Sequence, residues 1–293
     1  PTQFIWRSFD IWPLIRQCLW FELNTVSQRR SRARSSVLQK SLQKGAFDEI
    51  RAFLSDLSQC YINNGVESTA FISRPVYLQR LPNGTWFDRI LDPLVFSLES
   101  NINYSKYYLV PWLKTSNLLY EANLLRPLPS LCPAPIEDLR SVLTELALDA
   151  GIDPNQFLRH VSIKLTKFYK WYRFGTLFFG LRKNLKVIYL TGWYFPDSMG
   201  LIAAARERNV KVVDVQHGKQ GPLQAMFSGW YIPKNGYQML PDIFWCWGNP
   251  SANNILESSP NRFHHRPIVG GFPWIDYYCQ YIREQTASEQ NLH

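Results

Sequence analysis

Apolar and polar positions in the second half of the chain follow the order that is typical of α/β proteins. Residues 186–191 and 210–215 each hold a short, continuous apolar run, and the Ala-rich segment 197–208 between them has helical spacing. Continuous apolar strands joined by a helix predict parallel strands whose two faces are both covered. We therefore expect an α/β fold built on a Rossmann-like parallel sheet. The same pattern continues with predicted strands at 243–247 and 267–270 and a predicted helix near 250–257.

Helical spacing dominates the first part of the chain. From Pro13 to Asn24, Trp and Leu residues recur at helical intervals, and Pro13 suits the first turn of a helix. Residues 35–59 also read as one or two helices. We expect 1–65 to form a helical N-terminal region ahead of a Rossmann-like domain at 66–272. The Trp-rich helix fits two alternatives, a core-packing helix or an interfacial membrane helix.

The segment between these two regions contains shorter patterns that predict a hairpin, strands and helices. The turn signal at 82–85 lies between two apolar stretches and predicts a β-hairpin. Asp153 and Pro154 predict the cap and the first turn of a helix that runs to Phe174. The remaining predictions are strands at 68–72 and 107–110, a Pro-rich loop at 125–135, a helix at 136–150 and a basic helix side formed by Lys164, Lys167, Lys170 and Arg173.

Composition and charge narrow the class of protein. The chain has 293 residues, of which 46% are apolar, and a formal net charge of +9. The apolar content excludes an intrinsically disordered chain, and no apolar run reaches the ~18 residues of a membrane span. The charge fits a soluble basic surface, an anionic membrane face, a phosphorylated substrate or nucleic acid. The densest basic cluster, 28–35, comes with no helix-turn-helix or zinc-finger pattern, so the sequence does not favour nucleic acid.

Cysteine, histidine and glycine patterns exclude several kinds of site. The five cysteines lie far apart without a CxxC pair, so we expect neither a disulfide framework nor a zinc site, and a reducing cytoplasm fits best. His264 and His265 have no metal-ligating neighbours in the sequence and are expected in a solvated loop. No GxGxxG and no P-loop pattern supports dinucleotide or ATP binding. We therefore expect no metal and no bound cofactor.

Ligands of open parallel sheets bind beyond the carboxyl ends of the strands, and two predicted strand ends are marked. After 186–191, Gly192 permits a tight turn beside Trp193. Asp197 or Ser198 can cap the following helix, whose N-terminal amides favour an anion. We predict that these four residues contact substrate, and the alternative for Asp197 is capping alone.

The other marked strand end leads into a polar loop that contains Gln216, His217, Gly218 and Lys219. As neutral imidazole, His217 can accept a proton, and as imidazolium it can pair with a phosphate. We predict His217 as a catalytic base or hydrogen-bond donor, with the other three residues shaping the loop around a substrate. A purely structural role is the alternative for His217.

Two further groups are candidates for the site. Trp230 and Tyr237 lie in the aromatic loop 226–241 among Asn, Lys and Gln, which suits carbohydrate because sugar faces stack on rings. The alternative is a loop that packs over the sheet. Asp88 and Asp92, near the predicted hairpin, are the carboxylate candidates for a general base, with turn or cap roles as their alternative.

Three segments resemble the end of the N-terminal domain in GT-B-type glycosyltransferases of bacterial surface polysaccharide synthesis (capsule or O-antigen). They are Val-Val-Asp-Val-Gln-His-Gly at 212–218, Leu-Pro-Asp-Ile-Phe-Trp-Cys-Trp-Gly at 240–248 and Ile-Val-Gly-Gly-Phe-Pro-Trp-Ile-Asp at 268–276. In that family a strand ends in a His-Gly or Glu-Gly loop, a Pro-Asp strand ends in Gly, and a Val-Gly-x-Pro-x-x-Asp segment crosses into a second Rossmann domain. The Val-Gly-Gly-Phe-Pro form of this chain departs from the commoner Gly-Asn-Pro.

The resemblance implies the acceptor-binding domain of a cytoplasmic glycosyltransferase, peripheral at the inner face of the bacterial plasma membrane. A nucleotide sugar would be its co-substrate, and a growing polysaccharide or lipid-linked glycan its acceptor. Only 17 residues follow Asp276, so 273–293 is expected to begin the interdomain crossover, with the donor-binding domain outside this chain. The alternatives are a nucleotide-sugar 2-epimerase-like enzyme, in which these segments follow a similar order, and a non-catalytic glycan-binding or scaffold module of polysaccharide assembly or export.

Overall fold

A computed structural model of the chain describes residues 4–29, 66–81, 83–97, 102–109, 123–125, 127, 136–258, 263–275, 277–280 and 283. The helices predicted at 35–59 lie outside the described residues. So do most of the basic cluster at 28–35, most of the Pro-rich loop at 125–135 and most of the crossover segment at 273–293, including Asp276.

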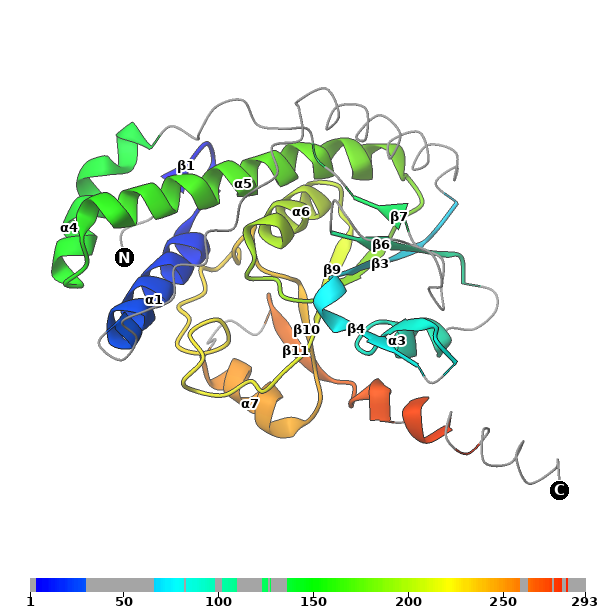
Figure 1. Cartoon of the computed structure of the whole chain (residues 1–293). Coiled ribbons are helices and arrows are strands. Elements are labelled where there is room, and N and C mark those ends of the chain that lie inside the picture. The colour runs from blue at the N-terminus through cyan, green and yellow to red at the C-terminus, as the bar shows by residue number, and fades with distance from the viewer. Residues whose placement is uncertain are drawn as a thin grey trace, which may run out of the picture.

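The centre of the described structure is a sheet of seven parallel strands (Figure 1). β3, although it comes first in the chain among these strands, lies inside the sheet: the next two strands add on one side of it and the four later strands add on the other. This is the order of a doubly wound sheet, and it confirms the predicted α/β fold with a parallel sheet. Across the sheet the strands are β11 (Arg266–Val269), β10 (Ile243–Cys246), β9 (Lys211–Val215), β8 (Val187–Leu190), β3 (Thr69–Ser73), β6 (Tyr104–Tyr108) and β7 (Asn123–Leu124).

One face of the sheet carries the larger core, which is formed with α5 (Pro154–Leu181) and α6 (Pro196–Glu207). These helices lie together above the sheet in Figure 1, with α1 (Trp12–Arg29) and α4 (Arg140–Asp149) beside α5. α7 (Asn249–Ser258) joins the same core near β10. The opposite face has a smaller core with α3 (Asp92–Phe96), next to the antiparallel hairpin of β4 (Leu78–Arg80) and β5 (Trp86–Asp88).

The Trp-rich segment forms α1 (Trp12–Arg29), which follows a small hairpin of β1 (Ile5–Trp6) and β2 (Phe9–Asp10). Leu14, Ile15 and Cys18 on α1 are fully buried in the core that also contains α5 residues. The described part of the N-terminal region therefore packs into the main core, as the core-packing alternative expects. No helix of the described ranges has the length and apolar character needed to cross a membrane.

α5 begins where the sequence predicts, because the Asp153 carboxylate accepts a hydrogen bond from the backbone N–H of Gln156 (2.9 Å) and Pro154 occupies the first turn. It continues to Leu181, beyond the predicted end at Phe174, since Phe178 and Phe179 extend its buried side. α5 crosses α6 at close range. A Cβ atom added to Gly200 would lie 2.5 Å from the carbonyl oxygen of Phe168.

Candidate functional site

The switch in strand order falls between β3 and β8, where successive connections leave the sheet in opposite directions. In doubly wound sheets the carboxyl edge at such a point is where ligands bind. Four side chains from the ends of β3, β8 and β9 gather there, and we call them the switch-point cluster: Arg74, Tyr77, Tyr194 and His217.

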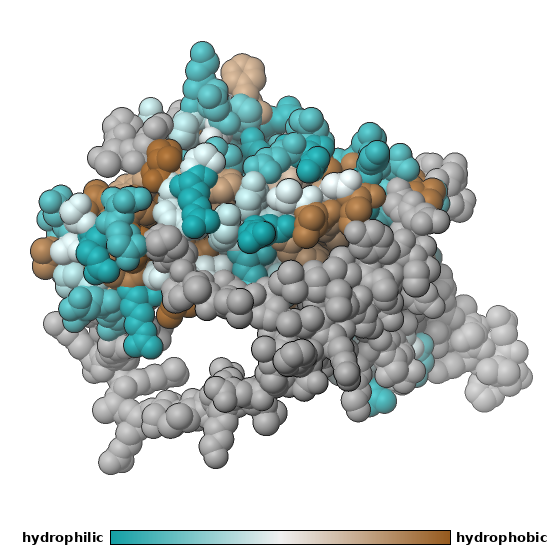
Figure 2. Space-filling model, turned by 90° about the horizontal axis from the view of Figure 1, so that it is seen from above, coloured by the Kyte–Doolittle hydropathy of each residue, from teal (hydrophilic) through white to brown (hydrophobic). Residues whose placement is uncertain are grey.

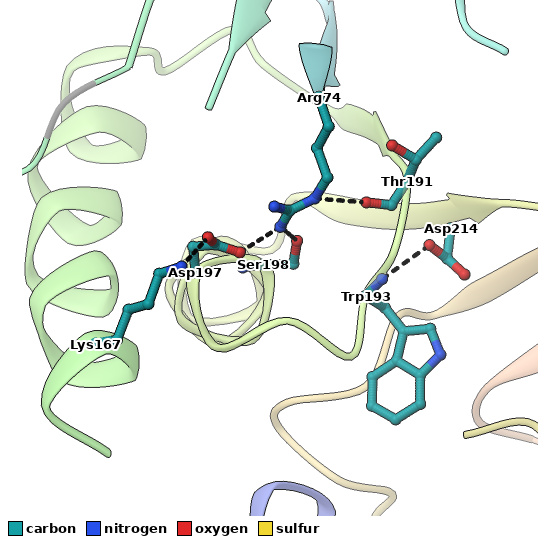
Figure 3. A network of polar contacts seen from close by, with 7 residues as sticks. All are labelled: Arg74, Lys167, Thr191, Trp193, Asp197, Ser198 and Asp214. Carbon is teal, nitrogen blue, oxygen red and sulfur yellow. Dashed lines mark hydrogen bonds and ion pairs between the residues drawn. The ribbon is translucent and has the colours of Figure 1, made fainter. Parts of the chain in front are cut away.

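Arg74 is the central cation of this edge (Figure 3). Its Nε donates to the carbonyl oxygen of Thr191 (3.3 Å), and its Nη2 donates to the Ser198 hydroxyl (2.8 Å) and to the Asp197 carboxylate. The guanidinium also stacks on the Phe195 ring at 4.2 Å. Arg74 thereby ties the end of β3 to the end of β8 and to the first turn of α6.

Asp197 is a buried carboxylate between two cations, Arg74 on one side and Lys167 of α5 on the other, at 2.8 Å from Lys167 Nζ. Burial by itself raises the pKa of Asp197, but the two positive charges outweigh it and hold the pKa at about 2. The cap position of α6 is held by Phe195, without a side-chain bond, so neither Asp197 nor Ser198 is the cap residue; the Asp197 carboxylate instead accepts from the backbone N–H of Ser198 (2.8 Å) within the first turn. The anion at this helix start is the protein's own carboxylate.

His217 is half-buried, and burial lowers the pKa of its imidazole to about 4. Its Nδ1 lies 3.3 Å from the carbonyl oxygen of Val215, which can only accept, so Nδ1 carries the hydrogen and Nε2 is the acceptor. Nε2 receives a hydrogen bond from the Tyr194 hydroxyl (3.1 Å), and the Tyr77 ring lies 5.3 Å away. The neutral form of His217, with a basic Nε2, therefore prevails near pH 7, and the imidazolium form does not.

Asp214, on β9 beside this cluster, is fully buried. Its Oδ1 accepts a hydrogen bond from the backbone N–H of Trp193 (3.0 Å), whereas its Oδ2 has no hydrogen-bond partner in the described part of the chain. Burial raises the pKa of Asp214 to about 8, against the opposing effect of backbone hydrogen bonds. Among Arg74, Lys167 and Asp197 the excess charge is positive, and the buried Asp88 also acts on Tyr77 at this edge.

The loop after β9 is held in place by hydrogen bonds of its own buried side chain, Gln216. The Gln216 side chain is buried, donates to the carbonyl oxygen of Gly218 (2.9 Å) and the Ser251 hydroxyl (3.1 Å), and accepts from the backbone N–H of Trp247 (2.7 Å). Gln216 therefore joins the ends of β9 and β10 instead of facing a substrate. Lys219 is exposed at the tip of the loop, beside the half-buried Gly218.

The turn after β8 shows why glycine stands at position 192. Gly192 has φ +71°, and a Cβ there would lie 2.7 Å from the Phe195 ring. Trp193 next to it is fully buried among aromatic side chains, with its ring 5.7 Å from that of Trp230. Trp193 and Ser198 are both buried, so they support the edge and do not present surface to a substrate.

The aromatic loop packs over the protein, as its structural alternative expects. Trp230 and Tyr237 are buried, and the Arg16 guanidinium stacks on the Trp230 ring at 4.1 Å. His265 is buried too, contrary to the expected solvated loop. It accepts from the backbone N–H of Tyr237 (2.8 Å) and donates to the carbonyl oxygen of Pro241 (2.6 Å), which fixes this loop to β11.

Asp88 and Asp92 form a buried cluster at the end of the hairpin, next to the switch-point cluster through Ser73 and Tyr77. Both side chains are fully buried. Asp88 accepts from the Ser73 hydroxyl and from the backbone N–H of Ile90 (2.9 Å), and Asp92 pairs with the equally buried Lys106. Burial raises the pKa of Asp92 against the opposing charge of Lys106. With these oxygens engaged inside the fold, we assign both carboxyl groups a structural role.

Arg74, Tyr77 and Tyr194 are the members of the switch-point cluster that sequence reasoning missed. Arg74 lies two positions beyond the predicted strand 68–72, which was a usable signal, because ligands of such sheets bind just beyond the carboxyl ends of the strands. Together the cluster offers a neutral base, two phenolic hydroxyls and an excess positive charge.

No protein-family model and no curated protein matches this chain. Among the described residues, no group of three or more His, Cys, Asp or Glu could hold a metal ion.

Proposed function

We propose that this chain is the acceptor-side part of a GT-B-type glycosyltransferase and that the switch-point cluster binds and deprotonates the acceptor. The observation that carries the proposal is His217: a neutral imidazole, partly exposed at the carboxyl edge of a doubly wound sheet, with Nε2 as its basic atom. The sequence resemblance at 212–218, 240–248 and 268–276 supplies the reaction class.

His217 acts as general base in this proposal. The acceptor hydroxyl replaces the Tyr194 hydroxyl at Nε2 and gives its proton to that nitrogen. The acceptor oxygen forms a bond to the anomeric carbon of the donor sugar, while the bond from that carbon to the diphosphate oxygen breaks. The nucleoside diphosphate leaves with the electron pair of the broken bond. Because Nδ1–H is held by the carbonyl oxygen of Val215, the imidazole keeps its orientation as it becomes charged.

Arg74 supplies positive charge next to His217. With Lys167 it exceeds the single charge of Asp197, which favours an acceptor that carries phosphate, such as a lipid-linked glycan. The nucleotide-sugar donor would bind mainly to a second domain, contributed by further sequence or a partner chain. The site needs no bound cofactor in this scheme.

The test is the His217→Ala variant of the complete enzyme, assayed with a panel of nucleotide sugars and membrane glycolipid as acceptor. Turnover should fall about a hundredfold or more, with KM for the acceptor changed much less, because the imidazole acts on the proton in the transition state. His264→Ala, which changes a half-buried histidine on the loop before β11, is the matched control. Unchanged turnover in His217→Ala would refute the role of His217 as general base.

Two readouts separate the alternatives. Release of free nucleotide from donor alone, without an acceptor product, would favour an epimerase-like enzyme over a transferase. Glycan binding with full pathway activity in His217→Ala would favour a non-catalytic glycan-binding module.

A further inference from the structure

α5 differs from the rest of the chain in its charge. Its 28 residues include no Asp or Glu. They include five basic residues, Arg159, Lys164, Lys167, Lys170 and Arg173. Elsewhere the chain balances its basic residues with 23 acidic ones. A long helix with charges of one sign creates a field that attracts an anionic partner.

The basic residues of α5 point in two directions. Lys167 pairs with Asp197, and Lys164 is half-buried with its Nζ 5.5 Å from the Phe21 ring. Of the other three, Arg159 and Arg173 are exposed and Lys170 is half-buried, and they recur with apolar residues at intervals of three or four positions, the spacing of one helix face. We call this face the outer stripe of α5: Arg159, Ile163, Thr166, Lys170, Arg173, Leu177 and Leu181.

The apolar members of the outer stripe are exposed to a degree that folding does not explain. Ile163 is 57% exposed, Leu177 58% and Leu181 44%, although the opposite side of the same helix is buried. Figure 2 views the molecule from above, the side on which α5 lies in Figure 1, and brown hydrophobic and teal hydrophilic side chains are mixed over the coloured part of that view. Aliphatic and cationic side chains thus share one surface.

This combination selects among anionic partners. Nucleic acid would use the cations through its phosphates and would leave three aliphatic side chains without a partner. An anionic lipid surface uses both kinds of side chain, because Lys and Arg meet the head groups while Ile and Leu enter the boundary with the acyl chains.

We propose that the outer stripe of α5 docks on an anionic lipid surface, with the helix parallel to the membrane plane. At 1.5 Å per residue the helix is about 42 Å long, enough for several head groups along its length. The proposal goes beyond the transfer chemistry and does not depend on it, because the stripe shares no residue with the switch-point cluster.

The test is sedimentation of the purified protein with vesicles of phosphatidylcholine plus phosphatidylglycerol, compared with vesicles of phosphatidylcholine alone. Wild type should partition to the anionic vesicles. The triple variant Arg159→Gln, Lys170→Gln, Arg173→Gln should partition about a hundredfold less, since each basic residue near an anionic surface contributes about fivefold. The matched control removes three exposed charges elsewhere, with Lys211→Gln, Lys234→Gln and Arg266→Gln, and should retain most of the binding.

A second variant, Leu177→Ser with Leu181→Ser, keeps every charge and should still lose binding at least tenfold, because the aliphatic side chains enter the bilayer. Equal binding of wild type and the charge triple variant would overturn the proposal. So would binding that the Leu variant leaves intact, and tighter binding to duplex DNA than to vesicles would assign the stripe to nucleic acid instead. Circular dichroism of each variant, all at exposed or half-exposed positions, checks that α5 is folded.

Discussion

At the scale of single residues, burial sets the charge of the site. His217 and Asp214 are both held in their neutral forms near pH 7, His217 because burial lowers its pKa to about 4 and Asp214 because burial raises its pKa to about 8. Asp197 stays ionised because two cations face it. The edge of the sheet therefore combines a neutral base with an excess of positive charge, which is what a phosphorylated acceptor would meet.

Asp214→Asn tests this account through the pH dependence of stability. In an unfolded chain the carboxyl group ionises near pH 4, whereas in the fold it stays protonated up to about pH 8. The neutral group thus stabilises the fold fully below about pH 4, and this contribution is lost as the pH rises through 8. Relative to wild type, Asp214→Asn should be nearly neutral near pH 4 and more stable by roughly 5 kcal/mol near pH 8.

Urea unfolding of both proteins across that pH range measures the difference. Asp149→Asn, which changes an exposed aspartate on α4, is the matched control. Stability curves of wild type and Asp214→Asn that run parallel with pH would contradict a neutral Asp214.

Sequence reasoning found His217 but missed its partners, and the reason is distance along the chain. The carboxylate that pairs with Arg74 lies 123 positions away, and the tyrosine that bonds His217 lies 23 positions away. No local pattern encodes such contacts. The sequence pattern also could not show that the side chains of Trp193, Trp230 and Tyr237 are buried, because an aromatic side chain in a Gly-rich loop suits both a core and a sugar site.

At the scale of elements, the crossing of α5 and α6 depends on glycine. Gly175 and Gly200 face the other helix so closely that a Cβ on Gly200 would meet the backbone carbonyl of Phe168 at 2.5 Å and the backbone nitrogen of Tyr172 at 2.7 Å. Backbone atoms inside a helix cannot move aside as a flexible side chain can. The helices must therefore separate if either glycine gains a side chain.

Gly200→Ala should lower the free energy of unfolding by about 3 kcal/mol or more, as overpacked substitutions against a rigid neighbour do. Gly180→Ala, on α5, is the matched control: its nearest neighbour would be the Arg208 guanidinium at 3.6 Å, and better helix propensity should stabilise by about 0.5–1 kcal/mol. Guanidinium unfolding midpoints measure both changes. A neutral Gly200→Ala would show that the crossing is looser than described.

The strength of the sequence signal decided which elements could be predicted. α4, α6, β8 and β9 were predicted with ends close to the observed ones, and α5 with its start but not its end, because their helical spacing or continuous apolar runs mark burial clearly. β1, β2 and β7 were not found, since two residues each carry no period.

At the scale of the whole molecule, Arg74 joins parts that are far apart in the chain. It follows β3 on one side of the switch in strand order and bonds the end of β8 and the start of α6 on the other, while Asp197 extends the link to α5 through Lys167. Removal of one member of a buried ion pair leaves the other charge without its partner, which costs far more than removal of both.

A double-mutant cycle tests this link. Arg74→Gln should lower the free energy of unfolding by roughly 3 kcal/mol, because Asp197 keeps only Lys167 as a counter-charge. Arg74→Gln with Asp197→Asn should lose at least 1 kcal/mol less than the sum of the two single variants. Strictly additive losses in urea unfolding would show that the two side chains are not coupled.

The central place of β3 also sets the order in which a newly made chain can assemble. β3 gains its neighbour β6 soon after synthesis, but Thr69 must wait for Val187, which is 118 positions later, to complete its other side. At a synthesis rate of roughly 5–20 residues per second this wait lasts on the order of ten seconds. During that interval the side of β3 that later pairs with β8, with Phe71 and Ile72, has no neighbouring strand.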